Sequence, residues 1–217
     1  MIRIWDLPTR LFHWILVVLV VFSVVSAEIG GNWLDWHMRS GYCILTLLLF
    51  RLLWGFAGSY HARFANFVRP PAAVLAYLRD LRNGTLARQG GHNPLGALSV
   101  VVLLIAFLLQ ASTGLFANDD STSTEGPLAK LVSNHTSNLL TAVHEINQWV
   151  LYTLVALHVA AIAYYYFARR ENLVTPMLTG DKPGTGLVSA TDDAGIRIRA
   201  AILLVIAGAV VGYIFTR

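Results

Sequence analysis

Cysteine, charge and alternating polarity are all scarce in this sequence, and each shortage excludes a class of protein. The single cysteine, Cys43, lies within an apolar stretch, so an intrachain disulfide is excluded. The sequence C-x-x-C-H is absent, which excludes a covalently attached haem. Charged residues make up only 13% of the chain, whereas soluble domains carry about a quarter. The apolar stretches are continuous rather than alternating, which argues against a membrane β-barrel.

Long apolar stretches are what the sequence has instead. Hydrophobic residues form 56% of the 217 residues, and five stretches approach the roughly twenty residues that a bilayer requires. We therefore expect an all-α integral membrane protein, in which a four-helix transmembrane bundle (residues 1–179) is followed by a flexible cytoplasmic linker (180–196) and a fifth, C-terminal helix. The first stretch is expected to remain as a membrane helix rather than a cleaved signal peptide, because His13 and Trp14 stand at its start. The expected membrane helices span residues 11–30, 36–57, 94–116, 138–168 and 197–217.

The basic residues indicate how these helices are oriented. If the N-terminus is cytoplasmic, thirteen of the sixteen lysines and arginines fall in segments on the cytoplasmic side, as the positive-inside rule requires. The C-terminus is then periplasmic, because the number of expected membrane helices is odd. The net charge of +4 arises from these segments and gives no indication of nucleic-acid binding. Within them, residues 70–84 predict a short amphipathic helix on the membrane surface.

Four histidines lie in or at the ends of the predicted membrane helices. His144 and His158 share the fourth helix, where fourteen residues return to within roughly 40° of one face while advancing about 21 Å. His13, at the start of the first helix, lies at the cytoplasmic depth of His158. His37, at the start of the second helix, lies at the periplasmic depth of His144. Depth alone therefore predicts two pairs, and we expect them to ligate two non-covalently bound haem b groups through both axial positions.

Histidines and arginines at these positions also admit simpler roles. A membrane histidine often packs or hydrogen-bonds between helices, and two on one helix face can form a proton relay. A non-haem metal site is less well supported, since no further His, Asp or Glu cluster lies at those depths. Arg39 and Arg51, at the two ends of the second helix, are candidate partners for haem propionates, although either could simply anchor the helix at the interface. His92 could contact a propionate or a quinone, or could serve only to start the third helix.

Several segments occur in the order found in a known family. They are WDLPTRLFHW, HMRSGYCILTLLLFRLLWGFAG, GHNPLGALS, VHEINQWVLYTLVALHV and ENLVTPMLTG. Over residues 4–182 the chain resembles the bacterial cytochrome b561 family, which includes the cytochrome b subunits of nickel–iron hydrogenases. The resemblance implies a haem-binding four-helix core, two b haems, and electron exchange with the quinone pool of the inner membrane. The ligand pattern of the family falls on His13, His37, His144 and His158.

The leading hypothesis is therefore a dihaem electron-transfer subunit. Electrons would pass between membrane quinone and a periplasmic redox protein, either a hydrogenase subunit or a c-type cytochrome. No nucleotide, iron–sulfur or flavin motif occurs in the loops. A second hypothesis is a stand-alone enzyme that oxidises superoxide at the outer face and reduces quinone, with Arg39 and Lys130 as steering cations. A third is a haem-free membrane anchor or transporter.

Overall fold

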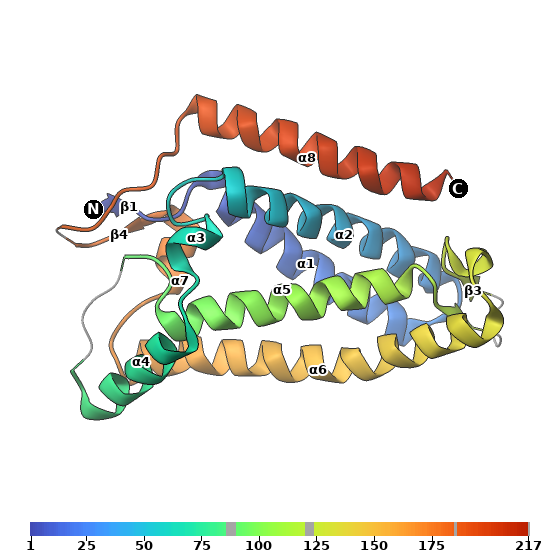
Figure 1. Ribbon diagram of the computed structural model, residues 1–217, viewed down its shortest axis with the longest axis horizontal. Coiled ribbons are helices and arrows are strands. Elements are labelled where there is room, and N and C mark those ends of the chain that lie inside the picture. Colours follow the sequence, from blue (N-terminus) through green and yellow to red (C-terminus); the bar gives the residue numbers. More distant parts are fainter. Residues whose placement is uncertain (86–89, 120–123, 185, 217) are drawn as a thin grey trace. The chain divides into compact units, whose positions relative to one another are not determined.

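Five long helices dominate the computed structural model (Figure 1), which describes residues 1–85, 90–119, 124–184 and 186–216. They begin and end within a few residues of the predicted positions. The largest differences are at the starts of the first and fourth helices, which begin at Leu7 and Asn134, each four residues earlier than expected. His135 therefore belongs to the first turn of the fourth helix. The five are α1 (Leu7–Ile29), α2 (Leu34–Ala57), α5 (Pro94–Gly114), α6 (Asn134–Phe167) and α8 (Ala194–Phe215).

These five helices, within the described part of the chain, are long and apolar enough to cross a membrane. Apolar side chains along α1 illustrate why a bilayer is required, since Val18 is 66% exposed and Val21 is 59% exposed. In water such a surface would be unfavourable, whereas lipid solvates it and the helix satisfies its own backbone hydrogen bonds. The prediction of an all-α integral membrane protein is thereby confirmed.

Short elements connect the long helices. The amphipathic helix predicted from the sequence is present as α4, which starts at a proline and ends where Gly84 adopts φ 74°, a conformation that glycine takes without strain. Two antiparallel strand pairs are formed, β1 with β4 and β2 with β3. The short helices are α3 (Phe64–Phe67), α4 (Pro71–Asn83) and α7 (Val174–Thr179), and the strands are β1 (Ile2–Arg3), β2 (Asn118–Asp119), β3 (Thr124–Glu125) and β4 (Asp181–Lys182).

Side-chain caps fix where two of the membrane helices start. The backbone N–H of Thr9 donates to Asp6 Oδ1 at 2.6 Å, and the Ser59 hydroxyl donates to the other oxygen of the same carboxylate. At α5 the backbone N–H of Gly96 donates to Asn93 Oδ1 at 2.7 Å. Asp and Asn are preferred at this position because they satisfy an N–H group that the helix leaves unpaired. Asn93 therefore caps the start of α5.

The chain forms two compact units, each described by itself. Each of the five long helices contributes residues to both units. The first unit comprises Met1–Leu11, Arg51–Leu103 and Leu154–Ala201, and the second comprises Phe12–Phe50, Leu104–Thr153 and Ile202–Arg217.

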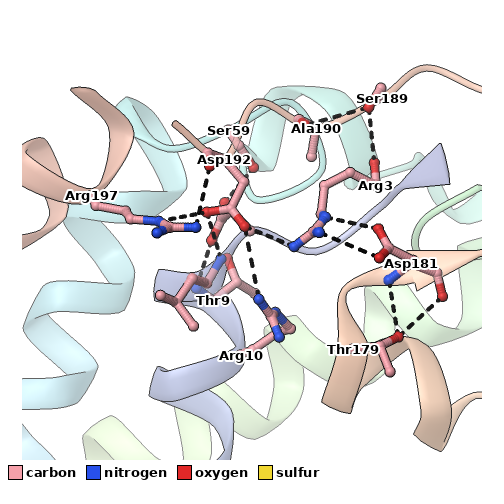
Figure 2. A network of polar contacts seen from close by, with 12 residues as sticks. Arg3, Thr9, Arg10, Ser59, Thr179, Asp181, Ser189, Ala190, Asp192 and Arg197 are labelled. Carbon is pink, nitrogen blue, oxygen red and sulfur yellow. Dashed lines mark hydrogen bonds and ion pairs between the residues drawn. The ribbon is translucent and has the colours of Figure 1, made fainter. Parts of the chain in front are cut away.

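In the first unit, described residues of the segment predicted as a linker, Asp181 and Asp192 among them, are bonded to the N-terminal residues. Figure 2 shows the polar network that holds it, centred on the Asp192 carboxylate. Arg3 Nη1 donates to Asp192 Oδ2 at 2.9 Å, and the backbone N–H of Leu7 donates to Asp192 Oδ1 at 3.2 Å. Arg197, in the first turn of α8, lies 3.3 Å from the same carboxylate. One side chain therefore joins the starts of α1 and α8.

In the second unit, α8 is packed into the apolar core. Val211 of α8 is buried together with Leu45 of α2 and Leu115, which directly follows α5. Within a membrane, contacts of this kind stabilise helix association by van der Waals packing rather than by removal of apolar surface from water. The fifth helix is thus an integrated part of this unit.

Candidate functional site

Two histidine rings face one another in the second unit. His37 comes from α2 and His144 from α6, and their ring centres are 6.2 Å apart with the ring planes at 88°. This is the pair that the sequence predicts at the periplasmic depth. Both side chains are partly buried rather than pointing into lipid.

Backbone carbonyl groups fix the tautomer of both rings. His37 Nδ1 lies 2.9 Å from the carbonyl oxygen of Ser23, and His144 Nδ1 lies 2.9 Å from the carbonyl oxygen of Gln110. Because a carbonyl oxygen only accepts, each Nδ1 must carry the hydrogen and donate it. In a neutral imidazole the Nε2 atom is then unprotonated and can ligate a metal, and a backbone partner of this kind is usual behind metal-ligating histidines.

The separation of the two rings fits a metal held between them. Two metal–nitrogen bonds of about 2 Å each, plus roughly 1.2 Å from each nitrogen to its ring centre, add up to about 6.4 Å. The observed 6.2 Å is close to this value. Among the described residues there is no group of three or more His, Cys, Asp or Glu side chains that could hold a metal ion. Two protein ligands suit a metal whose other positions are filled by a macrocycle, as in haem.

Gly114 leaves the space that His144 occupies. A Cβ atom at Gly114 would lie 2.9 Å from Cε1 of the His144 ring, which is closer than real Cβ contacts allow. The ring therefore packs directly against the α5 backbone, and the Thr113 hydroxyl lies 3.3 Å from its Nδ1 atom. These supporting contacts could not be anticipated from the spacing of histidines.

The other two predicted ligands are described in separate units. His13 belongs to the second unit, where its ring meets that of Trp14 edge-on at 5.0 Å. His158 belongs to the first unit and is partly buried on α6. Their pairing stays a prediction.

The two candidate arginines have different surroundings. Arg51, at the end of α2 in the first unit, is only 3% exposed, and its guanidinium lies 5.0 Å from the centre of the Phe64 ring. Arg39, in the second unit, is exposed and stacks over Trp36 at 5.1 Å. Lys130, the other proposed steering cation, is paired with Glu125 at 3.7 Å. The proposed contact of Arg39 with a propionate stays a prediction.

The first unit contains a cavity of about 540 Å³ beside a cluster of three hydrogen-bonding side chains. The hydroxyl groups of Tyr77 and Tyr165 lie 2.6 Å apart, and Asn93 Nδ2 donates to the Tyr165 hydroxyl at 3.1 Å. Burial and the hydrogen bond with Tyr165 raise the pKa of the Tyr77 hydroxyl, so it stays protonated at neutral pH. Sequence reasoning missed both tyrosines, although Tyr165 follows His158 by seven residues, which is two turns along one helix face.

The apolar helices define the class of this molecule, a multi-pass membrane protein. The facing imidazoles of His37 and His144 lie between two of its helices, at a separation that fits a bound metal cofactor. Residues 4–180 match the family described as prokaryotic cytochrome b561, and the chain belongs to this family. Membership implies haem b as the cofactor and electron transfer as the activity. The His37–His144 geometry fits that cofactor independently.

Curated relatives are similar to the chain over most of its length. One from Azotobacter vinelandii is 25% identical over 213 residues, which cover 82% of this chain and 87% of the relative. Another from Azotobacter chroococcum mcd 1 is 24% identical over 211 residues, covering 82% and 87%. A third, from Bradyrhizobium diazoefficiens, is 20% identical over 215 residues, covering 83% and 85%. Each is named a probable Ni/Fe-hydrogenase B-type cytochrome subunit. No solved structure gives a significant match.

Proposed function

We propose that this chain is the dihaem cytochrome b subunit of a membrane oxidoreductase, and that it carries electrons between a periplasmic hydrogenase and the quinone pool. The observation that carries the proposal is the facing pair His37 and His144, with each Nδ1 bonded to a carbonyl oxygen. The names of the relatives supply the hydrogenase partner. A c-type cytochrome is the other periplasmic partner that this geometry would serve.

His37 and His144 would hold the haem from two helices. When bound, haem b would supply reversible one-electron chemistry, which suits electron transfer. The protein's part is to hold both ligands still. Each Nδ1–H is bonded to a backbone carbonyl oxygen, and the Ser23 hydroxyl lies 3.1 Å from His37 Nδ1. Such bonds fix the ring orientation and raise the basicity of Nε2, which favours the oxidised form of a bound metal.

A second pair is proposed for the other depth of the membrane. His13 and His158 would hold the cytoplasmic-side haem, as their positions along α1 and α6 predict. Helix α6 then supplies one ligand to each haem, at positions about 21 Å apart along its axis. Electrons would cross the bilayer between these two sites, and protein rather than water would surround the path.

Selective loss of one haem tests the pairing. We expect His37→Ala to remove one b haem per chain and His13→Ala to remove the other, because each ligand is assigned to a different site. Low-temperature absorption spectra and a haem-to-protein ratio measure both losses. Retention of both haems in His37→Ala would contradict the site seen in the second unit. Loss of both haems from either well-folded variant would contradict two independent pairs.

Quinone is proposed to bind in the cavity of the first unit. Reduction of a quinone to a quinol consumes two electrons and two protons, so the site needs an electron donor and a route for protons. Tyr165 lies two helical turns, about 10 Å, beyond His158 on the same face of α6. Its hydroxyl is joined to Tyr77 and Asn93, and these groups can hydrogen-bond to a quinone oxygen.

Removal of one hydroxyl group tests this site. We expect Tyr165→Phe to keep both haems and to slow quinol-dependent haem reduction about fivefold or more, since a hydrogen bond of this kind contributes about 1 kcal/mol or more to binding. Stopped-flow absorption with a short-chain quinol measures the rate. Tyr164→Phe, the exposed neighbour, is the matched control. Unchanged quinol kinetics in Tyr165→Phe would place the quinone elsewhere.

The location is proposed to be the bacterial inner membrane. The distribution of basic residues places the N-terminus in the cytoplasm and the C-terminus in the periplasm. In that orientation the His37–His144 site lies toward a periplasmic partner.

A further inference from the structure

The guanidinium group of Arg51 is buried in the first unit, and one of its nitrogen atoms lacks a hydrogen-bond acceptor among the described residues. The side chain is 3% exposed, and its guanidinium lies over two phenylalanine rings, 5.0 Å from Phe64 and 5.9 Å from Phe67. Its Nη1 atom is buried and has no hydrogen-bond partner among the described residues. A buried guanidinium N–H group without an acceptor is costly, so the position calls for an acceptor supplied by another molecule.

His92 presents a second unsatisfied atom to the same aromatic cluster. Its ring packs against Phe67 at 4.6 Å and against Trp5 at 4.7 Å, and its buried Nδ1 atom has no hydrogen-bond partner among the described residues. Burial, the nearby Arg51 charge and His61 lower the pKa of His92 to about 3, so the ring is neutral at pH 7. The Phe67 ring therefore forms a wall that is common to Arg51 and His92.

The chemistry of the two atoms selects the ligand. Guanidinium N–H groups prefer carboxylate or phosphate oxygens, and a neutral imidazole with a hydrogen on Nδ1 donates one further bond. The neighbouring Asp6 carboxylate accepts from the Thr9 backbone and the Ser59 hydroxyl, and its charge acts on Arg51, but among the described residues Arg51 Nη1 still has no hydrogen-bond partner. A planar carboxylate beside an aromatic wall is the group that fits one cation and one neutral donor.

We propose that Arg51 and His92 together form a carboxylate clamp for a propionate of the cytoplasmic-side haem. The proposal rests on the proposed function, because it requires the haem assigned to His158. Arg51 supplies the compensating charge, and His92 supplies a second donor that orients the carboxylate. The sequence predicts a propionate contact for Arg51 and admits one for His92, and the clamp adds the shared Phe67 ring that brings the two side chains to one carboxylate.

Redox titration of the two haems tests the clamp. Arg51→Gln should lower the midpoint potential of one haem, because an uncompensated carboxylate opposes addition of an electron. His92→Gln should alter the potential of the same haem, and the double variant should differ from the sum of the singles because both side chains act on one carboxylate. The haem that moves should be the one that His158→Ala removes. Arg69→Gln and His61→Gln are matched controls, since Arg69 bonds to the Asn66 carbonyl oxygen and His61 to that of Val188.

An infrared measurement identifies the carboxylate. Redox difference spectra are recorded with haem carrying ¹³C at the propionate carboxyl carbons, and the isotope-sensitive bands should shift in both the Arg51 and His92 variants. Arg51→Lys, which keeps the charge but not the fork, covers the case in which Arg51→Gln does not fold. The clamp would be overturned if the propionate bands and the midpoint potentials were unchanged in these variants. It would also be overturned if they changed in the Arg51 variants but not in His92→Gln. Potentials that depend on added chloride or formate, with unshifted propionate bands, would also overturn it in favour of a free anion. A wild-type protein without haem would instead overturn the proposed function.

Discussion

At the residue scale, the tautomer of two imidazoles decides what the site in the second unit can bind. A hydrogen on Nδ1 is required by the carbonyl oxygens of Ser23 and Gln110, so the opposite nitrogen of each ring is available to a metal. The ring centres are 6.2 Å apart. This distance admits a metal between the rings, but it is too long for a direct hydrogen bond from one ring to the other.

Gly114 provides a residue-scale test of this packing. Replacement of glycine by alanine within a helix ordinarily stabilises it by about 0.5–1 kcal/mol. At Gly114 the new methyl group would lie 2.9 Å from the His144 ring, so we expect Gly114→Ala to displace the ring and to lower haem occupancy or shift one midpoint potential. Gly41→Ala, where nothing lies within 4 Å of the added atom, should leave both haems unchanged. Equal haem content and potentials in the two variants would show that the ring yields freely.

At the scale of elements, the positions of the helices could be predicted from the sequence, but the hydrogen bonds and ion pairs that join one element to another could not. Continuous apolar stretches predict the five membrane helices, and Asn93-Pro94 predicts the start of α5. The facing of His37 and His144 follows from depth along two helices. Their Nδ1 partners do not, because they are backbone atoms of other helices and every residue type carries them. The anchoring of segment 180–196 is equally hidden, since its ion pairs join residues far apart in the sequence, such as Arg3 and Asp192.

Asp192 tests whether α8 depends on this anchor. Its side chain is 6% exposed and accepts from Arg3, the Leu7 backbone and Arg197. We expect Asp192→Ala to reduce the free energy of unfolding by about 1–3 kcal/mol, because several donors lose a partly buried acceptor. A lower thermal midpoint in detergent and faster proteolysis within residues 183–193 measure the effect. Glu125→Ala, which breaks only the exposed pair with Lys130, should change stability by less than about 1 kcal/mol.

At the scale of the whole molecule, orientation decides which partner each site can meet. The asymmetry of basic residues is a property of the complete sequence, with thirteen of sixteen on the proposed cytoplasmic side. No single loop establishes it. In the proposed orientation, His37 and His144 lie in the periplasmic half of the membrane, where the proposed hydrogenase partner would dock.

The single cysteine makes this orientation testable. In a Cys43→Ser background, a cysteine introduced by Lys130→Cys should react with a membrane-impermeant maleimide in intact spheroplasts, because Lys130 is exposed and proposed to be periplasmic. A cysteine introduced by Arg69→Cys should react only after permeabilisation, since this exposed residue is proposed to be cytoplasmic. The reverse labelling pattern would show that the orientation is opposite to the one proposed, and it would exclude a periplasmic partner for His37 and His144.

The network around Asp192 also sets an order of events during biosynthesis. Arg3 leaves the ribosome long before Asp192, which follows it by 189 positions. Because protein synthesis proceeds at about 5–20 residues per second, Asp192 is synthesised roughly 10–40 s after Arg3. The first helices are therefore expected to enter the bilayer before these bonds can form, since the bonds require Asp192 and the start of α8. Nascent chains truncated before residue 192 would contain the four histidines proposed as haem ligands but would lack the polar network around Asp192.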